Sequence, residues 1–220
     1  MLWDLDDTLY SRVEAARLTF REMIKELLYP GREEAFYIEA ADYMIAHVKR
    51  NSMIHSDVFA ALLEKYPPDI PYNAEACVNF YYRNMPRFAV PSVDAVRILG
   101  ELRRAGLKTA IVTNIPEART LDQKIKIEAL GISHLFDAIV VSGELGIHKP
   151  DRRIFLHAAE LLGVKPDECL FVGDDPTSDV MGAIGADMEI VWLDTHEHDG
   201  RFDDDARVHR VGTLREYFCN

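Results

Sequence analysis

The chain has 220 residues and a mass of 25.1 kDa, enough for one large core or for a core with a modest second lobe. Hydrophobic residues make up 48% and charged residues 28%, close to the globular average, which excludes a disordered, collagenous or low-complexity chain. The net charge of −12 has the wrong sign for a surface that binds nucleic-acid phosphates, so we expect no nucleic-acid partner.

The three cysteines, Cys77, Cys169 and Cys219, are far apart and odd in number, so neither a disulfide framework nor a zinc site is indicated. No segment approaches the roughly 20 apolar residues of a membrane span, and the first residues do not form a signal peptide. We therefore expect a cytoplasmic protein that does not bind membranes.

The first element is a short apolar segment, Met1-Leu2-Trp3, which we interpret as the end of a strand before Asp4. Because an average strand has about five or six residues, we expect the complete protein to begin a few residues upstream of Met1. Residues 14–88 then carry a helical pattern instead of strands, with apolar residues at three- and four-residue spacing. Asn73 is placed to cap one of these helices.

From Ser92 the pattern changes to alternating helices and strands. Near-continuous apolar strands separated by capped helices are typical of a parallel sheet covered on both faces. The predicted helices are 92–105, 117–130, 151–162 and 178–184, and the predicted strands are 107–113, 138–142, 169–173 and 189–193. A polar acidic loop is expected at 194–206.

The predicted fold class is therefore α/β, with a doubly wound parallel sheet and a smaller helical domain. Residues 1–13 and 89–220 are expected to form the catalytic core. Residues 14–88 are expected to form a helical cap inserted after the first strand, which would close over the crevice of the core.

Polar side chains follow the predicted strands, where a ligand binds in a parallel α/β sheet. They are Asp4, Asp6, Thr8, Thr113, Asn114, Lys149, Asp174, Asp175 and Asp179. Several carboxylates in one crevice repel each other unless a cation is present. Oxygen ligands without thiolates suit Mg²⁺, and together with Lys149 and the Thr113 hydroxyl this ion could hold a phosphoryl group.

Four short motifs resemble those of the haloacid dehalogenase-like (HAD) superfamily, in its phosphatase branch. Asp4-Leu5-Asp6-Asp7-Thr8 is similar to the first motif, Asp-x-Asp-x-Thr. The second, third and fourth motifs are matched by Thr113-Asn114, Lys149-Pro150-Asp151 and Gly173-Asp174-Asp175-Pro176-Thr177-Ser178-Asp179. All four occur in the right order at predicted strand ends, which a chance match of short patterns rarely produces.

The resemblance implies a Mg²⁺-dependent phosphatase that hydrolyses a small soluble phosphate monoester through an aspartyl-phosphate. It makes Asp4 the nucleophile and Asp6 the general acid and base. Mg²⁺ would be bound by Asp4, by Asp174 and by the backbone carbonyl of Asp6.

The remaining residues of the motifs also receive roles from the resemblance. Thr113, Asn114 and Lys149 would hold the phosphoryl group. Thr8 would order the first loop, and Asp179 would act through a metal-bound water or by orienting Lys149. The substrate would be a phosphorylated metabolite of the nucleotide or sugar-phosphate class.

Two other functions stay open. A sugar-phosphate mutase, similar to β-phosphoglucomutase, would share all four motifs and pass the phosphoryl group to a second hydroxyl. A phospho-accepting signalling module would also combine clustered Asp with Thr and Lys, but it needs no helical insertion. Carbon–halogen cleavage is disfavoured, because dehalogenases of this superfamily have a non-acidic residue at the position of Asp6.

Other candidate residues have weaker signals. We expect the aromatic residues of the helical segment to be core residues and not substrate contacts; they are Tyr37, Tyr43, Phe80, Tyr81 and Tyr82. A polar break in the same segment offers possible substrate contacts at Arg50, Asn51 and His55. His196 and His198, with Asp194 and Asp199, are interpreted as a solvated loop and not as a metal site.

Overall fold

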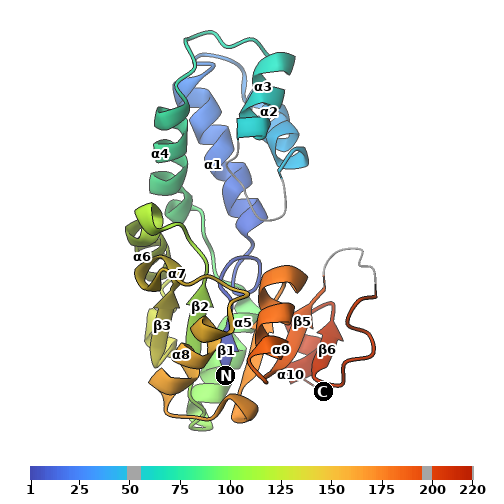
Figure 1. The fold of residues 1–220 in the computed structure, drawn as a ribbon. Helices are drawn as coiled ribbons and strands as arrows, with labels where there is room; N and C mark the ends of the chain where they lie inside the picture. Colours follow the sequence, from blue (N-terminus) through green and yellow to red (C-terminus); the bar gives the residue numbers. More distant parts are fainter. Residues whose placement is uncertain (49–55, 195–199, 220) are drawn as a thin grey trace. The chain divides into compact units, whose positions relative to one another are not determined.

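The computed structural model describes residues 1–48, 56–194 and 200–219. The chain divides into two compact units (Figure 1). One unit contains Met1–Ser11 and Pro91–Asn220, and the other contains Arg12–Val90. The role of the helical unit as a cap stays a prediction.

The first unit is built on a six-stranded parallel sheet with the strand order β3-β2-β1-β4-β5-β6. The strands are β1 (Leu2–Trp3), β2 (Ala110–Thr113), β3 (Ala138–Val141), β4 (Leu170–Gly173), β5 (Glu189–Leu193) and β6 (Val208–Val211). Every neighbouring pair is parallel. The α/β fold class predicted from the sequence is therefore confirmed.

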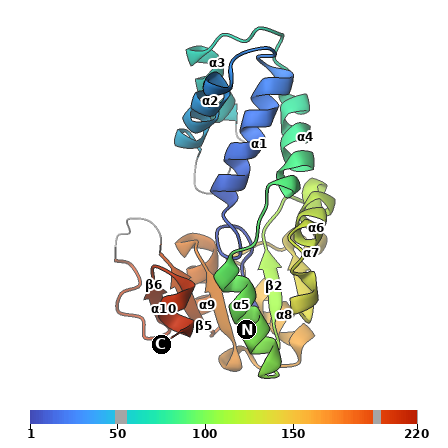
Figure 2. The same cartoon turned by 180° about the vertical axis from the view of Figure 1, so that it is seen from behind.

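Helices cover both faces of this sheet (Figures 1 and 2). They are α5 (Val93–Arg104), α6 (Thr120–Ala129), α7 (Ser142–Leu145), α8 (Arg152–Leu162), α9 (Met181–Gly185) and α10 (Leu214–Phe218). Helices α8 and α9 lie on one face, and α5 and α10 lie on the other. Short turns of 3-10 helix connect several elements: η2 (Glu117–Arg119), η3 (Ser133–Leu135) and η4 (Pro166–Glu168).

The apolar strands form these elements because both of their faces are buried. Ile111 and Val112 of β2, like Phe171 and Val172 of β4, are fully buried. On the face covered by α8, Phe155 packs against Phe171, with ring centroids 5.0 Å apart. This packing fixes the strand ends, and therefore the loops that follow them, in a rigid frame.

The order of the strands creates a switch point between β1 and β4. The chain proceeds from β1 to β2 and β3 on one side of the sheet, and then crosses to β4 on the other. Ligands of open α/β sheets bind outside the carboxyl ends of the strands at such a point. Asp4 and Asp174, which directly follow β1 and β4, flank it.

Several predicted boundaries differ from the structure. Strand β2 begins at Ala110 and not at Leu107, because Gly106 (φ 75°) turns the chain and Leu107 is 50% exposed. The helix predicted at 178–184 begins earlier, with a π-helical turn, η5 (Pro176–Val180), before α9. Ser142, predicted to end a strand, begins α7.

The sequence patterns did not predict β6 or α10. Strand β6 lies at the edge of the sheet and has mostly half-buried residues, so its sequence lacks the apolar run of a central strand. Helix α10 has only five residues, too few for a helical period to show.

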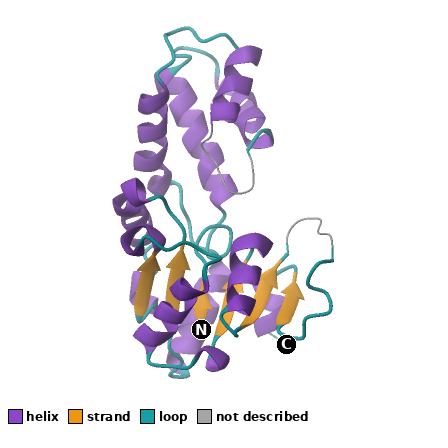
Figure 3. Cartoon of the chain, viewed as in Figure 1, coloured by secondary structure: helices purple, strands orange, loops and turns teal. Residues whose placement is uncertain are grey.

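The second unit consists of helices and loops in its described part (Figure 3). The helices are α1 (Arg12–Leu27), α2 (Glu34–Ala46), α3 (Ser56–Lys65), α4 (Ala74–Asn84) and the 3-10 turn η1 (Met85–Arg87). Asn73 caps α4 as predicted, because its side chain accepts a hydrogen bond from the backbone N–H of Ala76 at 3.0 Å.

The core of this unit contains two of the five aromatic residues that we expected there. Tyr37 and Tyr81 are buried, whereas the other three, Tyr43, Phe80 and Tyr82, are half-buried. Arg50, Asn51 and His55 lie outside the described residues, as do His196, His198 and Asp199. None of the described helices is long and apolar enough to span a membrane.

Candidate active site

The loop after β1 carries the first two carboxylates. Its start is fixed to β4, since the backbone N–H of Asp4 donates to the carbonyl of Val172 at 2.8 Å. The loop then closes through a hydrogen bond from the N–H of Leu9 to the carbonyl of Leu5 at 3.0 Å. Asp7 has a φ of 61°, a left-handed conformation that Asp tolerates better than most residues.

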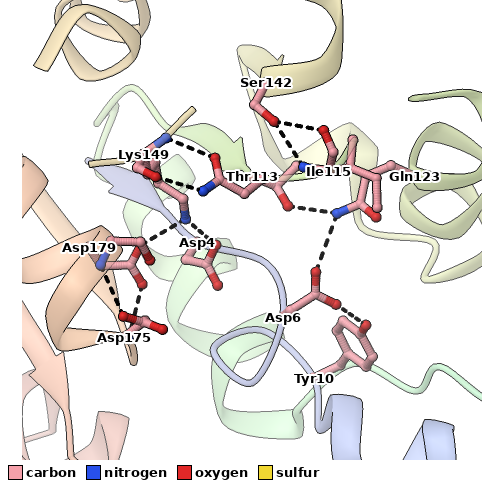
Figure 4. Close-up of polar contacts among 12 residues, drawn as sticks. Asp4, Asp6, Tyr10, Thr113, Ile115, Gln123, Ser142, Lys149, Asp175 and Asp179 are labelled. Atoms are coloured by element: carbon pink, nitrogen blue, oxygen red, sulfur yellow. Dashed lines mark hydrogen bonds and ion pairs between the residues drawn. The ribbon is translucent and has the colours of Figure 1, made fainter. Parts of the chain in front are cut away.

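Lys149 joins two of the predicted site residues. Its ammonium forms an ion pair with Asp4 and a second ion pair with Oδ1 of Asp179, at 2.8 Å. All three side chains are at least nine-tenths buried. Lys149 lies between α7 and α8, Asp4 follows β1, and Asp179 is in η5, so three segments that are far apart in the sequence meet at this lysine (Figure 4).

This cluster contains more negative than positive charge. Burial, which outweighs the attraction of Lys149, raises the pKa of Asp4 to about 7, with repulsion from Asp179 and Asp6 adding to the effect. Burial alone would lower the pKa of Lys149, but Asp179 and Asp4 together raise it above its ordinary value. Lys149 therefore carries a positive charge, and this single charge does not balance the negative charges of the carboxylates around it.

The loop after β4 is shaped by its own side chains. Asp175 caps η5 by accepting hydrogen bonds from the backbone N–H groups of Thr177 and Ser178, at 2.7 and 2.9 Å. The backbone N–H of Asp175 in turn donates to Oδ2 of Asp179 at 3.2 Å. Asp175 is thus a structural residue of the fourth motif, and Asp179 is oriented from both sides.

Gly173 allows this arrangement. A Cβ at this position would lie 2.3 Å from Oδ2 of Asp179 and 2.7 Å from its Cγ. The close approach of Asp179 to the end of β4 therefore requires a residue without a side chain.

The side chain of Asn114 binds the backbone of Lys149, and the predicted contact of Asn114 with the phosphoryl group stays a prediction. Its amide donates to the carbonyl of Lys149 and accepts from the N–H of Lys149, both at 2.9 Å. The side chain therefore holds the Lys149 loop against the end of β2. A phosphate contact by Asn114 would have to come from its backbone N–H.

Three residues near the site were not predicted: Tyr10, Gln123 and Lys126. Lys126 donates to Oδ1 of Asp6 at 2.7 Å, Gln123 donates to Oδ2 at 3.3 Å, and the Tyr10 hydroxyl donates to Oδ1. Gln123 also donates to Oγ1 of Thr113 at 2.6 Å.

A sequence signal for Gln123 and Lys126 did exist. They share a helical stripe with the buried residues Ile127 and Leu130, whereas Leu121 on another face is 70% exposed. A glutamine and a lysine at buried positions of an amphipathic helix are unusual and mark a site.

A hard metal ion fits the arrangement of carboxylates. Oxygen atoms of Asp4, Asp174 and Asp179 lie within 4.8 Å of one another, and all three residues are buried. Buried oxygen ligands with excess negative charge are the donor set that Mg²⁺ prefers. The Asp6 carboxylate is not part of this set, so its contribution would be the backbone carbonyl that the resemblance implied.

The structure brings the predicted residues Asp4, Lys149, Asp174 and Asp179 together at the switch point. Thr113 is fully buried at the end of β2. Thr8 is also buried, and its hydroxyl makes no hydrogen bond among the described residues. Its predicted ordering of the first loop stays a prediction.

Comparisons with known proteins give a consistent result. A sequence model of haloacid dehalogenase-like hydrolases matches residues 1–187. A glyceraldehyde 3-phosphate phosphatase of Methanopyrus kandleri is 32% identical over 98% of this chain and 94% of that protein. A phosphoserine phosphatase of Thermus thermophilus is 31% identical over 99% of this chain and 97% of that protein.

Solved structures share the fold. A hydrolase of Bacillus subtilis, bound to magnesium, superimposes with a TM-score of 0.74 over 98% of this chain and 94% of that chain, at 21% identity. A phosphatase of Thermococcus onnurineus superimposes with a TM-score of 0.62 over 98% of this chain and 94% of that chain, at 24% identity.

Proposed function

We propose a reaction on the premise that this chain belongs to the haloacid dehalogenase-like hydrolases. The chain is a phosphoric monoester hydrolase, and the reaction is the Mg²⁺-dependent hydrolysis of a small phosphate monoester. The observation that carries the proposal is the buried pairing of Lys149 with Asp4 and Asp179 at the switch point. The two relatives described above are named for the hydrolysis of small phosphate monoesters, which supports a small phosphorylated metabolite as substrate.

Asp4 is the nucleophile in this proposal. Its carboxylate attacks phosphorus in line with the ester oxygen, so that an aspartyl-phosphate forms as the ester bond breaks. Lys149 holds the Asp4 carboxylate in position. Because Lys149 is charged, it also offsets the negative charge of the phosphoryl group in a chain that carries a net charge of −12.

Asp6 transfers the protons of both steps. It first gives a proton to the leaving oxygen, which departs as an alcohol. It then takes a proton from water, which attacks the aspartyl-phosphate and releases inorganic phosphate, regenerating Asp4. Separating the nucleophile and the acid by two residues on one loop gives each a different environment: Asp4 faces Lys149, and Asp6 faces Lys126.

Thr113 and the backbone N–H of Asn114 donate to the oxygens of the phosphoryl group. Asp4, Asp174 and the Asp6 carbonyl would hold Mg²⁺, which would supply the positive charge that the buried carboxylates and the phosphoryl group require. Asp179 orients Lys149 through their direct ion pair. This contact favours the second of the two roles that the resemblance implied for Asp179.

The test is release of phosphate from p-nitrophenyl phosphate with added Mg²⁺, with chelator, and with the variant Asp4→Asn. We expect turnover that needs the metal and is lost in the variant, while the circular dichroism spectrum of the variant stays unchanged. Full activity of Asp4→Asn would contradict the mechanism. Movement of a phosphoryl group between positions of a sugar, without phosphate release, would favour the mutase.

A further inference from the structure

We propose that helix α6 positions the acid–base carboxylate through Lys126 and Gln123. The inference rests on the proposed function, because it gives Asp6 its role there, and it assigns two residues that the four motifs do not contain. Both residues lie in the same compact unit as Asp6.

The Asp6 carboxylate is held by both of its oxygens. Lys126 and Tyr10 donate to Oδ1, and Gln123 donates to Oδ2. The ammonium of Lys126 also lies 5.4 Å from the centre of the Tyr10 ring. A carboxylate on a loop would otherwise exchange between side-chain rotamers, and proton transfer needs it in one of them.

Stability does not explain the burial of Lys126. Its side chain is 9% exposed and that of Asp6 is 16% exposed, so both charges lose most of their contact with water. A buried ion pair often adds no stability compared with apolar side chains of the same size. Lys124, two residues earlier, pairs with Glu144 on the exposed surface, where its side chain keeps 48% of its exposure. We therefore explain the buried position of Lys126 by its contact with Asp6 and not by a contribution to folding stability.

Gln123 connects the acid–base residue with a phosphate ligand. Its amide nitrogen donates to Oδ2 of Asp6 at 3.3 Å, and an unprotonated carboxyl oxygen accepts such a bond both before and after Asp6 gives up its proton. The same nitrogen donates to Oγ1 of Thr113 at 2.6 Å. Because the Thr113 oxygen accepts this bond, its hydroxyl proton can be donated to another group. Gln123 thus contacts both Thr113 and Asp6 (Figure 4). In the proposed mechanism, this leaves the Thr113 hydroxyl as a donor for the phosphoryl group.

The geometry follows from the helix. Residues three apart in sequence lie on the same face of an α-helix, so Gln123 and Lys126 face the site together from α6 (Thr120–Ala129). A short shift of α6 would move both donors relative to Asp6. The helix therefore acts as the positioning element of the acid–base residue.

The experiment measures single-turnover kinetics of p-nitrophenyl phosphate with Mg²⁺ and enzyme in excess. The variants are Lys126→Met, Asp6→Asn and the double variant, with Lys124→Met as the matched control. We expect Lys126→Met to lower the catalytic rate constant at least roughly tenfold, because general acid–base catalysis contributes about 100- to 10,000-fold. The substrate concentration for half-maximal rate should change far less, and Lys124→Met should leave both unchanged.

The double variant separates positioning from a general effect on the fold. If Lys126 acts through Asp6, adding Lys126→Met to Asp6→Asn costs nothing further. Lys126→Arg should restore part of the activity, because it keeps the charge and a donor. The double variant removes both charges, so its thermal midpoint should stay near that of the parent chain, whereas Lys126→Met alone leaves the Asp6 carboxylate unpaired and should lower it.

Two results would overturn the inference while the proposed function stands. One is full activity of Lys126→Met, and the other is the same loss in the Asp6→Asn background as in the parent chain. Gln123→Met gives an independent check: we expect weaker substrate binding as well as slower turnover, since Thr113 loses its orienting contact. If the parent chain itself released no phosphate, the proposed function would fail, and the inference with it.

Discussion

Lys149 faces two buried carboxylates: Asp4, which follows β1, and Asp179, which lies in η5. Burial raises the pKa of Asp4 to about 7, despite the attraction of Lys149. The folded chain therefore binds a proton at Asp4 more tightly than the unfolded chain does. This contribution to stability is present below the ordinary carboxyl pKa and is lost as the pH rises toward about 7.

We predict that Asp4→Asn stabilises the metal-free protein at about pH 8, by up to a few kcal/mol, because one pKa unit corresponds to about 1.4 kcal/mol. The gain should shrink as the pH falls below about 7 and approach zero only below the ordinary carboxyl pKa of 3.8, where Asp4 is protonated in both the folded and the unfolded chain. Thermal unfolding with chelator, at several pH values, checks this. A variant that is less stable than the parent chain at about pH 8 would show that Asp4 is not under electrostatic strain.

Gly173 supports a second prediction about a single residue. Gly173→Ala would place a methyl group 2.3 Å from Oδ2 of Asp179, so Asp179 must move and its ion pair with Lys149 must loosen. We expect turnover to fall by roughly tenfold or more, since displacements of about 1 Å can cost up to about 100-fold. Gly185→Ala is the control, because a Cβ at Gly185 meets nothing within 4 Å. Equal activities of the two variants would contradict the prediction.

Site residues differed in how well the sequence predicted them. Asp4, Lys149, Asp174 and Asp179 were predicted from their place after strands, and tertiary packing brings them together at one edge. The lysine and glutamine that hold Asp6 were missed, because they come from the middle of a helix and not from a strand end. Their place on the buried face of an amphipathic helix was a signal for a site, but Asp6 stands about 120 residues earlier in the chain, and no local pattern identifies it as their partner.

At the scale of elements, the sequence predicted those helix ends at which a capping side chain begins the helix or a glycine ends it. Asn73 begins α4, and Gly163 (φ 63°) ends α8. Strand β6 was missed, because an edge strand needs only one covered side and its residues Val208–Val211 are mostly half-buried. The pattern of apolar residues indicates which residues are buried, but not which strands pair. It therefore predicts the central strands of a sheet and misses an edge strand.

The cap of α4 gives a prediction for one element of the helical unit. Asn73→Ala removes the hydrogen bond to the N–H of Ala76, and the loss of such a cap costs about 1 kcal/mol. Asn73→Asp should keep most of the stability, because aspartate caps equally well. Denaturant unfolding of the three proteins measures this. Equal midpoints for the alanine and aspartate variants would rule out a capping role.

At the scale of the whole molecule, the charge of −12 and the buried carboxylates act in the same direction. Both favour binding of a cation, and Asp4 and Asp174, which lie in one buried cluster of carboxylates, are its proposed ligands. An ion that binds only the folded chain stabilises it, by about 2.7 kcal/mol at a concentration of 100 times its Kd. Its binding must also displace any proton on its ligands.

We therefore predict that Mg²⁺ raises the thermal midpoint, and raises it more at about pH 8 than at about pH 6, where a metal-free Asp4 with a pKa of about 7 is mostly protonated. Asp174→Asn should remove most of the shift, whereas Asp204→Asn, which neutralises an exposed carboxylate, should keep it. Differential scanning calorimetry at fixed ionic strength separates the specific site from general screening of the charge. Equal shifts of the thermal midpoint in the two variants would mean that Mg²⁺ acts on the charged surface as a whole. Equal shifts at the two pH values would mean that Asp4 is not a ligand of the ion.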